Sequence, residues 1–115
     1  MTPNTPPNGP GRLLGIALVA EGAALVVTVL AAGGGHGTYA PAKVLFPYSM
    51  ALTAATGEIT SPLVVIALAQ YPAYAVIMWA LRGTSTRQRR WIGLACVHVL
   101  AVAWAFVSAD SSFTP

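Results

Sequence analysis

Four polar residues lie inside long apolar stretches of the chain, where side chains able to handle protons or bind ligands are rare. Glu21 is the one formal charge between residues 13 and 32, and the other three residues are Gln70, Tyr74 and His98. A carboxyl group in an apolar environment is costly unless it is neutralised or partnered, so such a residue is a functional-site hypothesis by default. These four residues are the possible proton or ligand site.

Glu21 has two interpretations. In the structural one it is a neutral carboxylic acid that forms a hydrogen bond to a neighbouring helix. In the functional one it is a proton or cation site that alternates between charged and neutral states. His98 is its natural partner, because a His–Glu pair can relay protons. A single membrane histidine is also commonly a packed, hydrogen-bonded residue, so both interpretations stay open.

The composition places these residues in a membrane protein. Of the 115 residues, 56% are hydrophobic and only 8% are charged, whereas about 25% of the residues of soluble domains are charged. Three runs hold almost no charge, at 13–32, 62–81 and 91–109. A helix of such length reaches about 30 Å, the thickness of the hydrocarbon core of a bilayer. We therefore expect an all-α integral membrane protein.

The expected organisation is a disordered proline-rich tail at 1–11 and a single transmembrane helical domain at 12–110. Four short transmembrane helices are expected, at about 13–32, 41–57, 62–81 and 91–109. The second is the ambiguous one, because seventeen residues give only about 25 Å and Pro47 would kink the helix. The alternative is three crossings plus an interfacial or re-entrant helix at 41–57.

Helical counting places the four polar residues near one depth. With four crossings, Glu21 and Gln70 lie eight residues from the outer ends of their helices, and Tyr74 and His98 lie seven to eight residues from the inner ends. The two levels then differ by roughly 7 Å. With three crossings, Glu21, Tyr74 and His98 fall at one level. Either topology allows a cluster near the middle of the membrane.

The basic residues predict the orientation. Four of the six are Arg82, Arg87, Arg89 and Arg90, the pattern of a cytoplasmic loop under the positive-inside rule. Both topologies place the loop 82–90 in the cytoplasm and the C-terminus outside. The expected location is the cell membrane, either a plasma membrane or a bacterial inner membrane. This clustering indicates no nucleic-acid partner.

No pattern of catalytic residues is present. The sequence has no paired carboxylates, nucleophile elbow, Walker loop, zinc-ligand spacing or dinucleotide fingerprint. Cys96 is the single cysteine, so neither an intramolecular disulfide nor a cysteine-based metal site can form. A haem would need a second axial ligand, and His36 lies in or near a loop away from His98. We expect no enzyme, no cofactor and no metal.

The stretch LVAEGAALVV, at 18–27, adds a family resemblance. With its length, its four short expected crossings and this first-helix glutamate, the chain resembles the small multidrug resistance transporters in architecture. Those proteins work as dimers and use the first-helix glutamate for proton-coupled export. The resemblance implies that Glu21 is the coupling residue. The family's glycine-rich third-helix pattern has no match in 71–83.

The function that we expect is that of a small polytopic membrane protein of unassigned activity with a mid-membrane polar cluster. It would act through helix packing in the lipid bilayer, as a homo-oligomer or as an accessory subunit of a membrane-protein partner. Alanine and glycine on the helix faces suit such association, because small residues let backbones approach closely. The alternative is a proton-coupled small-molecule carrier that uses Glu21 and His98.

Overall fold

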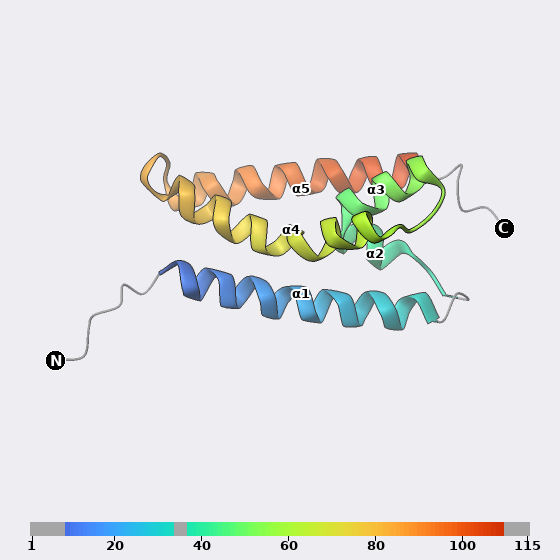
Figure 1. Cartoon of the computed structure of the whole chain (residues 1–115). Coiled ribbons are helices and arrows are strands. Elements are labelled where there is room, and N and C mark those ends of the chain that lie inside the picture. The colour runs from blue at the N-terminus through green and yellow to red at the C-terminus, as the bar shows by residue number, and fades with distance from the viewer. Residues whose placement is uncertain (1–8, 34–36, 110–115) are drawn as a thin grey trace.

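The computed structural model describes residues 9–33 and 37–109. Every regular element in this part of the chain is helical, which confirms the predicted all-α class. The elements in chain order are α1 (Pro10–Ala32), α2 (Ala40–Leu45), α3 (Pro47–Thr56), α4 (Ser61–Ala80), the 3-10 turn η2 (Leu81–Gly83) and α5 (Arg87–Ala109). The three long helices run side by side with α4 in the middle (Figure 1).

Three helices within the described residues are long and apolar enough to cross a membrane: Pro10–Ala32, Ser61–Gly83 and Arg87–Ser108. They correspond to the three uncharged runs of the sequence. α1 begins at Pro10, a position that favours proline because its missing N–H needs no partner there. Residues 1–8 of the expected tail and the C-terminal residues 110–115 lie outside the described part of the chain, as does His36.

The single helix expected at 41–57 is instead two short helices, separated at Phe46. Pro47 has no N–H to donate, and a proline disfavours helical geometry at the residue before it. Phe46 accordingly has φ −128° and ψ 57°. Pro47 then starts α3, where its fixed φ suits the first helical position. At ~1.5 Å per residue, α2 and α3 reach only about 9 and 15 Å.

The α2–α3 segment enters and leaves the bundle at the same end. The last turn of α1 and the turn between α3 and α4 both lie at this end, whereas η2 lies at the opposite end beside the start of α1 (Figure 1). Gly57 closes α3 with φ 75°, in the left-handed region that favours glycine, and its N–H bonds to the Thr53 carbonyl. The segment is therefore a helical hairpin inserted from one end.

The core lies where this hairpin meets the long helices. α3 packs against both α5 and α4, while α1 packs mainly against α4. Ala42, Met50 and Ala105 form a buried apolar cluster. Thr53 is only 1% exposed. Its hydroxyl donates to the Ser49 carbonyl at 2.9 Å, and the Ser49 hydroxyl donates to the Leu63 carbonyl at 2.8 Å. Small and hydroxyl-bearing residues thus bring α3 close to its neighbours.

Candidate functional site

The break at Phe46 frees backbone carbonyl groups near the middle of the bundle. The last carbonyls of any helix lack intrahelical donors. For α2 these include Val44 and Leu45, because the chain turns away at Phe46 and Pro47 lacks an N–H. Carbonyl groups away from water need donors from elsewhere in the protein. The side chains of α4 and α5 provide them.

Three side chains donate to these two carbonyls. Gln70 Nε2 and the Tyr71 hydroxyl of α4 both donate to the Leu45 carbonyl, at 2.9 and 3.1 Å. His98 Nε2 of α5 donates to the Val44 carbonyl at 2.8 Å. The polar side chains near the midpoints of α4 and α5 thereby satisfy the terminal carbonyls of α2, which lies 25 to 54 residues earlier in the chain.

This arrangement fixes the tautomer of His98. A carbonyl oxygen can only accept, so Nε2 carries the hydrogen in its bond to Val44. In the neutral ring Nδ1 is then an acceptor, and the Tyr74 hydroxyl donates to it at 2.9 Å. The result is a relay of hydrogen bonds from Tyr74 through the imidazole to the broken helix. Tyr74 orients the imidazole that binds Val44.

Aromatic rings enclose this relay. Tyr74 makes edge-to-face contacts with Tyr48, Tyr71 and His98, at centroid distances of 6.4, 6.0 and 5.9 Å. Phe46, at the break itself, contacts Tyr71 in the same geometry at 5.8 Å. Such pairs favour one ring orientation over others. The aromatic contacts therefore hold the donors in place around the break.

Glu21 is buried but stands apart from the relay. It lies midway along α1, is 5% exposed, and its Oε1 atom has no hydrogen-bond partner within the described residues. Thr28 Oγ1 on the same helix and Gln70 Oε1 on α4 share this property. The structure thus joins Gln70, Tyr74 and His98 around the α2 terminus, and records no bond from Glu21 to any of them. A buried acceptor without a donor is costly, and costlier still when charged.

Sequence reasoning missed Tyr71 as a member of this site. Its hydroxyl shares the Leu45 carbonyl with Gln70. The available signal was Pro47. A proline in a membrane helix frees a carbonyl, which neighbouring helices must satisfy.

The expected basic loop is largely helical. Arg87, Arg89 and Arg90 belong to the first turn of α5, and Arg82 to η2. Arg82 donates to the Trp79 carbonyl at 2.9 Å, with its guanidinium 4.1 Å from the Trp79 ring centroid. Arg90 donates to the Met78 carbonyl at 2.7 Å. Cations at the C-terminal end of α4 suit its exposed carbonyls and its dipole.

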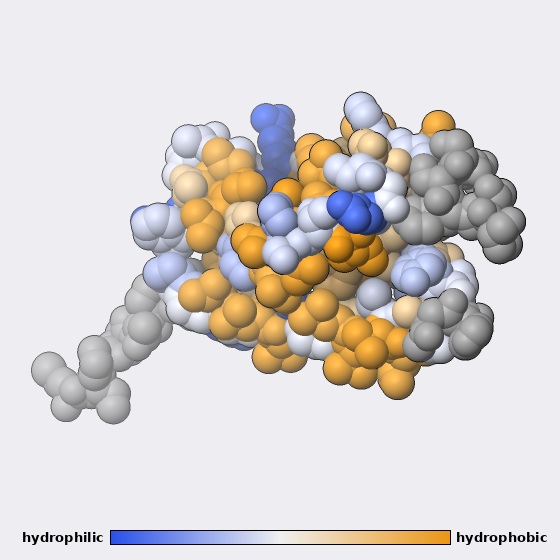
Figure 2. Space-filling view, turned by 45° about the vertical axis from the view of Figure 1, so that its right-hand side comes forward, coloured by the Kyte–Doolittle hydropathy of each residue, from blue (hydrophilic) through white to orange (hydrophobic). Residues whose placement is uncertain are grey.

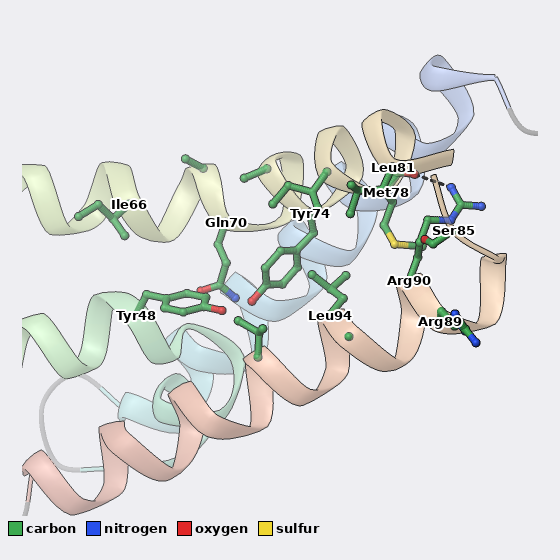
Figure 3. A pocket seen from close by; sticks show the side chains of 15 residues that line it. Tyr48, Ile66, Gln70, Tyr74, Met78, Leu81, Ser85, Arg89, Arg90 and Leu94 are labelled. Atoms are coloured by element: carbon green, nitrogen blue, oxygen red, sulfur yellow. Dashed lines mark hydrogen bonds between the residues drawn. The ribbon is translucent and has the colours of Figure 1, made fainter. Parts of the chain in front are cut away.

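A cavity of about 720 Å³ lies between α4 and α5, from Tyr48 to the arginines (Figure 3). Gln70 and Tyr74 line it near the middle of the bundle, and Ser85, Arg89 and Arg90 line it near η2. The wall between these groups is apolar. Its volume falls within the range of ligand pockets, ~300–1,000 Å³. No group of three or more potential metal-binding side chains occurs in the residues that the structure describes.

Comparisons with protein families, curated proteins and solved structures find no match for this chain.

Proposed function

We propose that the protein is embedded in a membrane with three crossings, by α1, α4 and α5, and with α2–α3 as a re-entrant hairpin. The lengths of the helices support this topology, because neither α2 nor α3 could span a core of ~30 Å. Val19, Leu30 and Val107 are 76%, 74% and 80% exposed. Apolar side chains also cover much of the face drawn in Figure 2. Soluble proteins rarely expose such large apolar patches.

The proposed topology replaces four crossings with three and also predicts the orientation. The start of α1 and the arginine-rich residues 82–90 lie at one end of the bundle (Figure 1). The positive-inside rule places this end in the cytoplasm and the C-terminus outside. Arg12 joins the four arginines on the cytoplasmic side, and Lys43 enters from the opposite side.

Within this membrane domain, the proposed activity is structural: helix association as a homo-oligomer or as an accessory subunit. One observation supports it most. The donor groups of Gln70, Tyr71 and His98 are already engaged within the chain. These residues hold the hairpin in place, so their presence needs no substrate. The long α5 leaves most of its surface uncovered, and a second helix surface can pack there.

Cross-linking in intact membranes tests the association. α5 carries small residues Ala95 and Ala103 at exposed positions. A cysteine at either position, in a Cys96→Ala background, should form disulfide-linked dimers or a larger cross-linked complex. The matched control is a cysteine at buried Ala105, which should form none. Absence of any cross-link at the exposed positions, with the protein present in the membrane, would contradict the proposal.

A proton-coupled small-molecule carrier is the second candidate, and the unpartnered Oε1 of buried Glu21 favours it. A carboxyl group without a fixed partner is free to exchange a proton or to bind a cation. The first-helix glutamate is the feature shared with the small multidrug resistance transporters, whereas their four crossings are replaced by three in the topology proposed here. In proteoliposomes, a pH gradient should then drive uptake of the lipophilic cation tetraphenylphosphonium. Glu21→Gln should abolish this uptake without changing assembly; equal uptake by both proteins would exclude Glu21 coupling.

A further inference from the structure

The cavity between α4 and α5 has the shape of a lateral groove with two chemically different ends. Its wall consists of aliphatic and small side chains: Ile66, Ala69, Ala73, Ile77, Leu94 and Val97. Figure 3 shows Tyr48, Gln70 and Tyr74 together at one end and Ser85, Arg89 and Arg90 at the other. The groove therefore has a long apolar body and a cationic end.

No segment of the described chain fills this groove. The α2–α3 hairpin occupies the space beside α4 and α5 only as far as Tyr48. Beyond it the two helices contact each other little. At Gly93, which lines the groove, an added Cβ would meet no atom within 4 Å. In a bilayer such a lateral space is filled by something apolar, because voids forfeit dispersion contacts on one side.

The cationic end lacks an internal counter-ion. In the described residues the acidic side chains are Glu21, midway along α1, and Glu58, in the turn at the opposite end of the bundle. The side chain of Arg89 is exposed. Arg90 uses Nη1 on the Met78 carbonyl, and its buried Nε atom has no partner. An anionic group from outside the chain would complete this end.

We propose that the groove binds an anionic phospholipid of the surrounding leaflet. One acyl chain lies along the apolar wall toward Tyr74, and the phosphate binds Arg89, Arg90 and the Ser85 hydroxyl. Basic pockets between membrane helices on the cytoplasmic side suit anionic headgroups. The acyl chain brings the apolar surface that the wall requires. This inference rests on the membrane embedding proposed above.

Native mass spectrometry of the full chain tests the proposal. The protein is reconstituted in vesicles of equal phosphatidylglycerol and phosphatidylcholine, extracted in mild detergent, and its retained lipids are counted. The wild type should retain phosphatidylglycerol preferentially. Arg89→Gln should reduce this preference about fivefold, equivalent to ~1 kcal/mol for one basic residue near anionic lipid.

Arg87→Gln is the matched control for Arg89→Gln, and Gly15→Leu is the matched control for Gly93→Leu. They distinguish lipid binding in the groove from diffuse charge attraction and from altered folding. Arg87→Gln removes the same charge from the same helical turn but does not line the groove, so it should change the preference less than twofold. Gly93→Leu fills the groove and should reduce retention of both lipids severalfold. Gly15→Leu, at an open position on α1, should leave retention unchanged.

The outcomes that overturn the proposal are distinct. Equal effects of Arg89→Gln and Arg87→Gln would show diffuse surface attraction, and no effect of Gly93→Leu would show that the groove holds no acyl chain. Flotation of the vesicles checks the embedding separately. A protein that floats with vesicles but shows no lipid preference overturns the lipid site alone; a protein that fails to float overturns the embedding as well.

Discussion

The two halves of the bundle differ in what fills the space between α4 and α5: the α2–α3 hairpin in one half and a cavity in the other. In the half that contains the α2–α3 hairpin, here called the packed half, buried Met50 and Thr53 bring α3 against its neighbours. In the half that runs from Tyr48 to η2, here called the open half, α4 and α5 line a cavity. The hairpin makes most of the packing between α4 and α5, whose direct contacts are few and include the Tyr74–His98 and Arg90–Met78 hydrogen bonds.

The polar relay lies where the packed half meets the open half, because Tyr74 also lines the cavity. It should control the stability of the packed half. His98→Ala removes the donor to the Val44 carbonyl and the acceptor of Tyr74. We expect the free energy of unfolding to fall by ~2–3 kcal/mol, since in the proposed membrane the Val44 carbonyl and the Tyr74 hydroxyl would both lose their partners. Unfolding in mixed micelles by a denaturing detergent measures this loss. Val99→Ala, at a neighbouring residue that is 64% exposed, should cost less than ~0.5 kcal/mol.

The two donors to Leu45 should show coupling. Gln70→Leu leaves Tyr71 on that carbonyl, and Tyr71→Phe leaves Gln70 there, so each substitution alone should cost about 1 kcal/mol. The double variant removes both donors. Its loss of stability should exceed the sum of the single losses by at least ~0.5 kcal/mol. Strict additivity would show that Leu45 does not depend on either donor.

The turn that closes the packed half should be more sensitive than the turn that closes the open half. Gly57 has φ 75°, which costs an L-residue roughly 1–2 kcal/mol. Gly57→Ala should therefore destabilise the protein by about 1 kcal/mol. Gly83→Ala is the matched control, because Gly83 has no positive φ and an added Cβ there meets open space. Equal thermal shifts for both variants would contradict the comparison.

The smallest effect, of opposite sign, is expected in the open half. Gly93→Ala adds a methyl group where the structure has room. It also replaces glycine inside a helix by a better helix former, so stability should rise by up to ~1 kcal/mol. A loss of stability in lipid-free micelles would indicate that α4 and α5 pack together there, and that the groove closes in solution.

Much of this architecture is predictable from sequence because long apolar runs dictate helices of membrane length. The runs at 13–32, 62–81 and 91–109 correspond to the three long helices. The polar residues Gln70, Tyr74 and His98 also stand out, since such side chains are rare in apolar runs. Counting residues along each helix places these three side chains near the middle of α4 and α5, so it predicts that they lie at similar depths.

The helix break could not be predicted from the proline alone. Pro47 interrupts the chain at Phe46, whereas Pro72 lies inside the continuous helix α4. The difference depends on partners far away in sequence. At Pro47, Gln70 and His98 supply donors to the freed carbonyls. The local sequence does not indicate which side chains of another helix will donate to the freed carbonyls. Whether 41–57 crosses the membrane or forms an interfacial or re-entrant segment therefore stayed open.

The sequence shows that residues 82–90 are rich in arginine, but the prediction that they form a loop was only partly correct. The clustering of arginines predicted a loop at 82–90. A run of arginines at the start of a helix also opposes the helix dipole. In the structure, however, α5 starts at Arg87. Arg90 reaches back to the Met78 carbonyl at the end of α4. The tertiary contact offsets the unfavourable local position.

The central claim, that residues 41–57 form a re-entrant hairpin, is tested most directly by cysteine accessibility. Single cysteines at Thr38, Glu58 and Thr84 are placed in the Cys96→Ala background and labelled in intact cells with a membrane-impermeant maleimide. With a re-entrant hairpin, Thr38→Cys and Glu58→Cys should be labelled from the same side, outside, and Thr84→Cys only after permeabilisation. Labelling of Glu58→Cys from outside, with Thr38→Cys protected together with Thr84→Cys, would mean that 41–57 crosses the membrane and would exclude the hairpin.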